Sequence, residues 1–228
     1  MADKKKEKKP KKRGGIFIFL GLLLILGAGG LVIYNNWEAQ KALQASESVA
    51  EVLKQEILAE REAETVPAAN AQEGDGQEAG AAEETSAEEQ LPWYMTSIEI
   101  DGNFYIGLIE IPEASISLPV ISDWDYEKLK IAPCRFTGSV NEDDLVICAH
   151  NYSTHFSGIK WLSPGADVYF TTADGNAIHY MVTTIENVAP TDVATMIQDG
   201  VDPWDLTLFT CSTDGRTRCA VRCVRVKE

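Results

Sequence analysis

The chain has 228 residues and a formal net charge of −15. This length allows one sizeable domain with appendages, or two very small domains. Eight of the first thirteen residues are Lys or Arg, so the rest of the chain is strongly acidic. An acidic body argues against nucleic-acid binding, because phosphate contacts need Lys and Arg.

The first element is an uncharged segment at residues 16–34, which follows a basic tail at residues 1–15. A helix of about this length, roughly 30 Å, matches the hydrocarbon core of a bilayer. The positive charge before it predicts a single-pass signal anchor in the cell membrane, with a cytoplasmic N-terminus and an extracellular remainder. A cleaved signal peptide is the alternative, with a cleavage site near Ala28, but apolar residues continue beyond that position.

The next two segments are predicted to carry the chain away from the membrane. Residues 35–64 place Leu43, Val49, Leu53 and Ile57 near helical spacing, which predicts a helical stalk. Residues 65–90 contain seven acidic residues and no Lys or Arg. Such a segment buries too little apolar surface to order itself, which predicts a disordered acidic linker that divides the stalk from the following domain.

Residues 91–228 are predicted to form a mainly β domain with one core. Short apolar and β-branched runs alternate with turn residues, which is typical of an all-β barrel or sandwich. The predicted strands are 105–111, 117–121, 145–150, 167–172, 177–188, 206–211 and 218–226. Short helices are predicted at 124–129, 157–162 and 191–198.

The chain has five cysteines, and an odd number leaves at least one free thiol. Their spacing does not match a zinc site, because no CxxC pair and no matching His pair is present. The pattern leaves the disulfide state open. The cysteines are Cys134, Cys148, Cys211, Cys219 and Cys223.

Three residues at strand ends could carry chemistry together. His150 ends one apolar strand, Cys211 ends another, and Arg218 opens the last strand. A nearby cation favours the thiolate form of a cysteine, which is the nucleophile. A histidine can protonate a leaving amine, and a guanidinium can donate to a developing oxyanion.

Other interpretations of these residues stay open from the pattern alone. His155 is a second candidate for the acid/base, and Arg216 and Arg222 compete with Arg218. Arg222 would share the face of Arg218 in a regular strand. A cysteine after an apolar strand is also often a core residue, and a histidine at a strand end is often a surface residue.

The segment around Cys211 resembles the TLxTC signature of the sortase family, with Thr207, Leu208, Thr210 and Cys211 in place. Ala149-His150-Asn151 resembles the histidine segment of that family, and Arg218 stands where the family carries its arginine. Residues 107–112 and 118–120 are similar to its opening strands. The resemblance covers roughly residues 104–226, with the three motifs in the family's order.

The resemblance implies an eight-stranded sortase-type β-barrel and a cysteine transpeptidase. Cys211 would attack an LPxTG-like sorting signal near the C-terminus of a secreted protein, forming a thioacyl-enzyme. His150 would protonate the departing amine, and Arg218 would stabilise the oxyanion. Thr210, Ala149 and Asn151 would contact the substrate. An amine of a cell-wall precursor or of a pilin, in a Gram-positive bacterium, would then resolve the thioester.

The resemblance implies no cofactor, although some sortases bind calcium near the position of the acidic loop at residues 141–144, and carboxylates suit calcium. A solvated turn is the plainer interpretation of this loop. Since no second apolar segment follows the domain and residues 189–205 leave room only for a short helix, we expect a housekeeping-like or small accessory sortase. A peptidase that only hydrolyses, and a non-catalytic binding module on the same barrel, are the alternative functions.

Overall fold

The computed structural model describes residues 14–65, 91, 93–197, 204–212 and 214–227. The chain divides into two compact units, Met1–Gln40 and Lys41–Glu228. The predicted basic tail falls outside the described residues except for its last two positions. The predicted acidic linker falls outside them except for Thr65, which ends the first helix.

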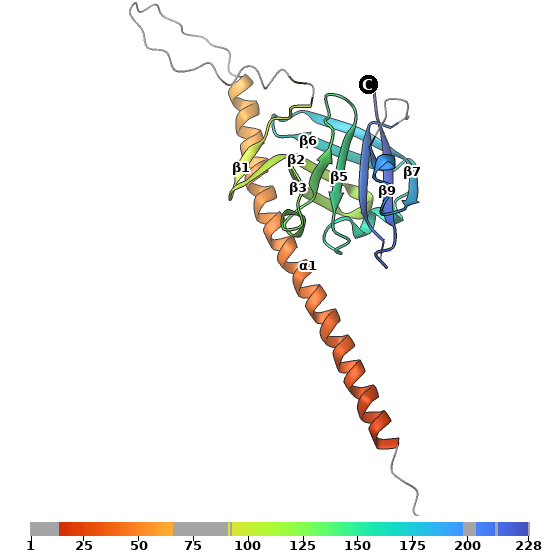
Figure 1. The fold of residues 1–228 in the computed structure, drawn as a ribbon. Coiled ribbons are helices and arrows are strands. Elements are labelled where there is room, and N and C mark those ends of the chain that lie inside the picture. The colour runs from red at the N-terminus through yellow and green to blue at the C-terminus, as the bar shows by residue number, and fades with distance from the viewer. Residues whose placement is uncertain (1–13, 66–90, 92, 198–203, 213, 228) are drawn as a thin grey trace, which may run out of the picture. The chain divides into compact units, whose positions relative to one another are not determined.

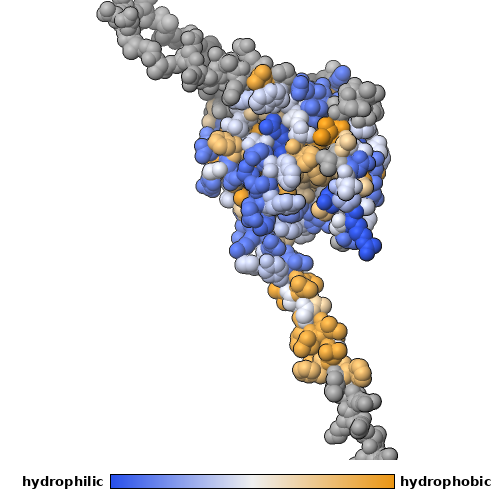
Figure 2. All heavy atoms as spheres, viewed as in Figure 1, coloured by the Kyte–Doolittle hydropathy of each residue, from blue (hydrophilic) through white to orange (hydrophobic). Residues whose placement is uncertain are grey.

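The first described element is helix α1, Gly14–Thr65 (Figure 1). It is continuous through the predicted anchor and the predicted stalk. Its large apolar side chains from Phe17 to Ile33 are exposed, and they form the orange stretch of the helix in Figure 2. By length and composition, the segment Phe17–Ala59 is long and apolar enough to cross a membrane.

The second unit contains a closed β-barrel. Strands β2 to β9 form a ring in the order β2-β3-β4-β5-β8-β9-β7-β6, and a pairing between β2 and β6 closes it. The short strand β1 pairs antiparallel with the N-terminal end of β2. This eight-stranded barrel confirms the fold predicted from the resemblance. The strands are β1 Ile98–Ile100, β2 Asn103–Ile111, β3 Ile116–Ile121, β4 Cys134–Thr137, β5 Leu145–Ala149, β6 Asp167–Thr172, β7 Ala177–Val188, β8 Leu206–Cys211 and β9 Arg218–Arg225.

The described helical turns between the strands are short 3-10 segments. They are η1 Pro112–Ala114, η2 Lys128–Lys130, η3 Phe156–Trp161 and η4 Val193–Met196. The predicted short helices at 124–129, 157–162 and 191–198 overlap η2, η3 and η4. Strand β4 was missed by the sequence analysis, because it is only four residues long and follows a proline.

Closure of the barrel depends on a glycine in β2. Gly107 pairs with Val120 of β3 on one side and with Thr172 of β6 on the other. Its φ of +152° is one that residues with side chains rarely adopt, and a Cβ atom there would lie 2.1 Å from the carbonyl oxygen of Thr171. Glycine is therefore needed where β6 approaches β2 closely.

The barrel has an apolar interior and an apolar patch on its outside. In β8, Leu206 and Leu208 belong to the interior core, and the alternating residues face outward. In β5, Ile147 belongs to the interior core, whereas Cys148 belongs to the outer cluster. Because both faces of β5 are covered, this strand is apolar throughout rather than alternating.

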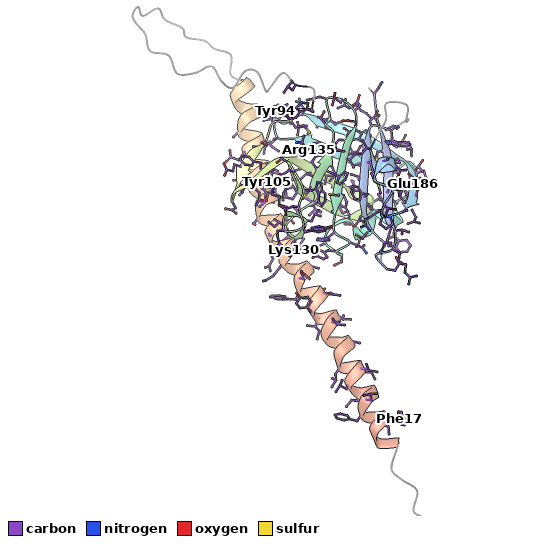
Figure 3. All side chains as sticks on the ribbon, in the orientation of Figure 1. Phe17, Tyr94, Tyr105, Lys130, Arg135 and Glu186 are labelled. Carbon is purple, nitrogen blue, oxygen red and sulfur yellow. The ribbon has the colours of Figure 1, made fainter. Side chains whose placement is uncertain are left out.

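The C-terminal part of α1 covers the outer patch. Val49, Leu53 and Ile57 form a cluster with Tyr105 and with outward residues of neighbouring strands, and Tyr105 lies against α1 in Figure 3. Helix α1 therefore packs on the barrel through its residues 49–57, whereas the predicted linker after it lies outside the described residues. An apolar stripe of this kind is also typical of a stalk. Here it packs on the barrel, and this contact buries the stripe within a single chain.

Candidate active site

The ends of β5 and β8 bring His150 and Cys211 to the same edge of the barrel. The two strands are parallel and in register, with Ala149 opposite Thr210. The Thr210 hydroxyl donates a hydrogen bond of 2.9 Å to the carbonyl oxygen of Ala149, which fastens the two strand ends together. The residues that follow Ala149 and Thr210, His150 and Cys211, therefore emerge side by side.

Strand β9 brings Arg218 to the same edge. It is antiparallel to β8, and Cys211 lies directly opposite Arg218 in the register. The turn between them is closed by the side chain of Ser212, which accepts from the backbone N–H of Thr217 at 3.0 Å. Backbone pairing thus holds Cys211 and Arg218 directly, and His150 follows the last paired residue of β5, which positions the three more rigidly than long loops would.

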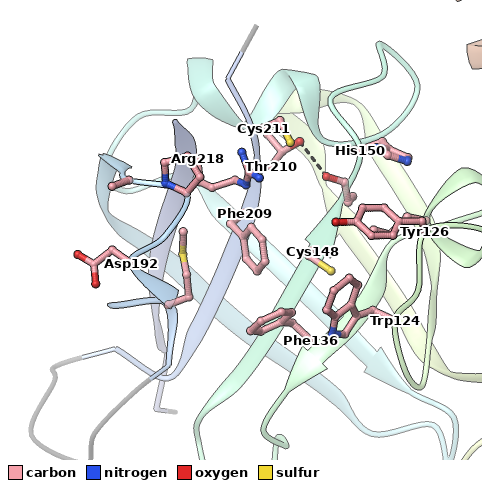
Figure 4. A pocket seen from close by; sticks show the side chains of 15 residues that line it. Trp124, Tyr126, Phe136, Cys148, His150, Asp192, Phe209, Thr210, Cys211 and Arg218 are labelled. Atoms are coloured by element: carbon pink, nitrogen blue, oxygen red, sulfur yellow. Dashed lines mark hydrogen bonds between the residues drawn. The ribbon is translucent and has the colours of Figure 1, made fainter. Parts of the chain in front are cut away.

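These side chains line a pocket of about 320 Å³. Figure 4 shows Cys211 between Arg218 on one side and His150 on the other. Ala149 and Thr210 also line the pocket, so it contains five of the six predicted site residues. Asn151 does not line the pocket, although it follows His150 directly, and its side-chain oxygen is buried.

Most of the remaining lining is apolar or aromatic. One wall comes from the loop after β7 and from η4, and it includes Ala189, Pro190 and Met196. The other wall is aromatic, and in it Phe136 and Phe209 meet edge to face with ring centroids 5.3 Å apart. An apolar pocket with a few convergent polar groups is typical of a ligand site.

The structure distinguishes the competing histidines by their positions. His155 is 1% exposed and does not line the pocket, and burial lowers its pKa to about 4, so it stays neutral at pH 7. His179 lies in β7 and pairs with Asp167 at 2.7 Å. Of the three histidines, His150 is the one that lines the pocket.

The competing arginines are also distinguished. Arg222 lies on the same face of β9 as Arg218, but it is 1% exposed and is engaged by Glu186 at 2.9 Å. Arg216 is exposed and pairs loosely with Asp214 at 3.9 Å. Arg218 is the arginine that lines the pocket.

The other cysteines differ from Cys211 in their surroundings. Cys148 is buried at the pocket floor, and burial raises its pKa to about 12. Burial also raises the thiol pKa of Cys134, Cys219 and Cys223. These four thiols are therefore protonated at neutral pH, whereas Cys211 is only half-buried.

The acidic loop at residues 141–144 uses its carboxylates within the protein. Asp143 forms an ion pair of 2.7 Å with Arg225. Asp144 accepts a hydrogen bond of 2.7 Å from the backbone N–H of Ser139. Within the described part of the chain, no group of three or more His, Cys, Asp or Glu side chains is placed to hold a metal ion.

Most residues of the pocket wall have no recognisable signal in the sequence. Trp124 and Tyr126 lie on a loop and Met196 ends the short segment η4, and no local pattern indicates where such connections fold in space. Phe209 had a detectable signal, because it faces outward between two inward residues of an apolar strand. An aromatic residue that faces away from the core beside the nucleophile is a reasonable candidate for a substrate contact.

The barrel part of the chain matches a known protein family. The family model for the sortase domain matches residues 109–226, just over half of the chain, and includes His150, Cys211 and Arg218. The chain therefore belongs to the sortase family. A search of curated protein sequences gives no match.

Solved structures with a similar fold are also sortases. Sortase A from Corynebacterium diphtheriae is 22% identical, with a TM-score of 0.49, over 55% of this chain and 62% of that chain, so the chain spans less than two thirds of it. Pilus-related sortase C of Group B Streptococcus is 26% identical, with a TM-score of 0.48, over 57% and 70%. Clostridium perfringens sortase C with the C-terminal cell wall sorting motif is 25% identical, with a TM-score of 0.47, over 54% and 71%.

Proposed function

We propose that this protein is a membrane-anchored cysteine transpeptidase that joins secreted proteins to an amine acceptor at the cell surface. The observation that supports this most is the meeting of Cys211, His150 and Arg218 around one pocket through the pairing of β5, β8 and β9. Membership of the sortase family supports the same reaction.

The first half of the reaction would acylate Cys211. The thiolate sulfur attacks the carbonyl carbon of the scissile peptide bond in an LPxTG-like sorting signal, and a C–S bond forms. The C–N bond then breaks, and His150 gives a proton to the departing amine. Arg218, opposite Cys211 in the register, donates hydrogen bonds to the carbonyl oxygen as negative charge develops on it.

The second half would transfer the acyl group. A primary amine of a cell-wall precursor or of a pilin attacks the thioester carbon, a C–N bond forms, and the electron pair of the C–S bond returns to sulfur. His150 accepts the proton that the amine loses. Thr210 contributes by holding the strand end that bears Cys211 next to the strand end that bears His150.

The N-terminal segment fits a surface enzyme of this kind. We propose that residues 16–34 span the membrane as a single-pass anchor, with residues 1–15 in the cytoplasm and the barrel outside. The exposed apolar side chains of α1 and the eight basic residues before it support this topology.

The test uses the full chain in detergent micelles. The protein is mixed with LPxTG-like and NPxTx-like peptides, with and without triglycine, and mass spectrometry follows both the peptides and the protein. Cys211→Ala, His150→Ala and Arg218→Ala are compared with Arg216→Ala, a matched control whose side chain is exposed outside the pocket.

We expect an acyl adduct on Cys211 and an amine-dependent ligation product. Both are lost in Cys211→Ala, fall by two or more orders of magnitude in the other two pocket variants, and persist in the control. Cleavage that is unaffected by the amine would identify a peptidase instead. Peptide binding without any adduct would identify a non-catalytic binding module.

A further inference from the structure

Two aromatic side chains in the pocket have no part in the chemistry described above. Trp124 and Tyr126 lie on the loop between β3 and η2, and 40% and 72% of their surfaces are exposed. Their rings meet edge to face, with centroids 5.9 Å apart and an interplanar angle of 82°. Large exposed aromatic rings that line a pocket are characteristic of a ligand subsite.

The loop that carries these two rings is held in place. The carboxylate of Asp125 accepts hydrogen bonds from the backbone N–H groups of Glu127 at 2.8 Å and Lys128 at 2.7 Å. Asp123 pairs with Lys128 at 2.6 Å. The Trp124 ring also packs on Phe136, with centroids 5.5 Å apart. The rings are therefore presented to the pocket by a preorganised turn.

The position of the rings indicates which substrate they face. In Figure 4, Tyr126 and Trp124 lie on the His150 side of Cys211, whereas Arg218 lies on the opposite side. The histidine gives a proton to the leaving amine and takes one from the entering amine, so both amines must occupy its side of the pocket. The acyl carbonyl, which Arg218 would hold, lies on the other side.

We propose, resting on the function proposed above, that Trp124 and Tyr126 form the acceptor subsite, and that it selects a primary amine on an alkyl chain, as in a lysine side chain. The alkyl stem packs on the rings, and the ammonium is attracted to their faces. The carboxylate of Asp123 is already paired with Lys128. The attraction for the ammonium is therefore assigned to the aromatic rings and not to Asp123. A glycine-type amine has no stem and gains less from this surface.

The bound ammonium becomes the nucleophile in a balanced step. It releases one proton to solvent, and its neutral nitrogen then forms a C–N bond with the thioacyl carbon. The C–S bond breaks, and its electron pair returns to the sulfur of Cys211. A second proton passes from nitrogen to His150, which restores the proton that the histidine gave to the leaving amine.

The test compares two acceptors at a saturating concentration of a peptide that acylates the full chain. Nα-acetyl-lysine amide and triglycine are titrated against Tyr126→Leu and Trp124→Leu. Trp161→Leu is the matched control, since that tryptophan is 78% exposed and does not line the pocket. We expect KM for the lysine amine to rise about tenfold in both pocket variants. KM for triglycine should rise by less than this, and Trp161→Leu should change neither KM nor the rate of acylation by more than twofold.

Three results would overturn the subsite. Slower acylation with an unchanged KM for the lysine amine would place the acyl peptide on these rings. An equal rise in KM for both acceptors would show that the rings do not select between them. A loss of thermal stability that matches the loss of ligation would show that the rings have a structural role. Saturation-transfer NMR with Cys211→Ala protein separates this proposal from the function proposed above. Binding of Nα-acetyl-lysine amide must depend on Tyr126 and Trp124, even in protein that cannot be acylated.

Discussion

The guanidinium of Arg222 connects the barrel to one wall of the pocket. Its Nε donates to Glu186 at 2.9 Å, and one terminal nitrogen donates to the Thr207 hydroxyl at 2.9 Å. The other terminal nitrogen donates to the carbonyl oxygen of Thr195, which precedes Met196 in the pocket wall. Its planar group also lies 4.6 Å from the ring of Trp204. Arg222, which competed with Arg218 in the sequence, therefore holds one wall of the pocket in position.

Arg222→Lys should loosen this wall. A lysine retains the charge but cannot make the forked contacts or stack on Trp204, so we expect a loss of roughly 1–3 kcal/mol in the free energy of unfolding. KM for the sorting peptide should rise more than kcat falls. Urea denaturation and ligation kinetics measure the two effects. Arg216→Lys, at an exposed position, should lie within about 0.5 kcal/mol of the unmodified protein.

His155 should make stability depend on pH. Burial lowers its pKa in the folded protein to about 4, whereas the unfolded chain has an ordinary value near 6.5. Between these values the unfolded state binds more protons. The stabilisation from neutral His155 is therefore complete above about pH 6.5 and is lost as pH falls toward 4, by about 3 kcal/mol.

The measurement is the free energy of unfolding in urea at several pH values between 7 and 4. In His155→Leu, this part of the pH dependence should disappear. The difference in free energy of unfolding between the variant and the unmodified protein should therefore not be the same at pH 7 and at pH 4. If the variant and the unmodified protein lost the same stability across this range, titration of His155 would not be the cause.

Helix α1 packs on the outer patch of the barrel. Leu53 is fully buried, and it packs in one cluster with Tyr105, Leu108 and Ile121. The part of the helix from Lys41 onward therefore belongs to the same compact unit as the barrel. Its Ser46 hydroxyl donates to the carbonyl oxygen of Ile131 at 2.7 Å, which adds a polar contact to the apolar ones.

Leu53→Ala should lower the free energy of unfolding by about 2–4 kcal/mol, because the cavity cannot collapse between a helix and a strand layer. Leu58→Ala offers a matched control on the same helix, since Leu58 is 58% exposed. We expect the control to change stability by less than about 0.5 kcal/mol. Equal effects in both variants, measured by thermal or urea unfolding, would mean that the helix does not dock in solution.

Sequence patterns predicted the strands better than they predicted the contacts between elements. Strands β6, β7 and β8 were predicted with their observed bounds, because runs of β-branched and apolar residues end at clear turns. The strand-end positions of His150 and Cys211 followed from the same runs. The docking of α1 could not be predicted, since a stripe at helical spacing does not indicate what it packs against. The aromatic wall from Trp124 and Tyr126 depends on a loop whose path is set by tertiary contacts.

The whole chain combines an apolar helix segment with a compact unit that contains the barrel. The segment from Phe17 to Trp37 exposes its large apolar side chains, whereas the helix residues after Lys41 bury an apolar stripe on the barrel. The first segment therefore needs an apolar environment such as a bilayer, whereas the second unit is stable in water. This difference supports the proposed division between an anchor and a surface enzyme.

Removing residues 1–40 should separate these two requirements. We expect residues 41–228 to remain soluble without detergent and to keep the ligation activity, whereas the full chain sediments with membranes. Ultracentrifugation and the ligation assay measure both properties. Removing residues 1–90 instead should lower the midpoint of thermal unfolding, because the barrel then loses the helix that covers Leu108 and Ile121. An unchanged midpoint would contradict this.

The parallel pairing of β5 with β8 also has a consequence for folding. The hydrogen bond between Thr210 and Ala149 joins residues 61 positions apart, and β6 and β7 lie between them in the sequence. Contacts of such high sequence separation pay loop-closure entropy before they gain enthalpy, so they tend to form late. Cys211 and His150 should therefore meet only as the barrel closes. Under the proposed function, a partly folded chain would then carry an unassembled site that cannot yet cleave a peptide.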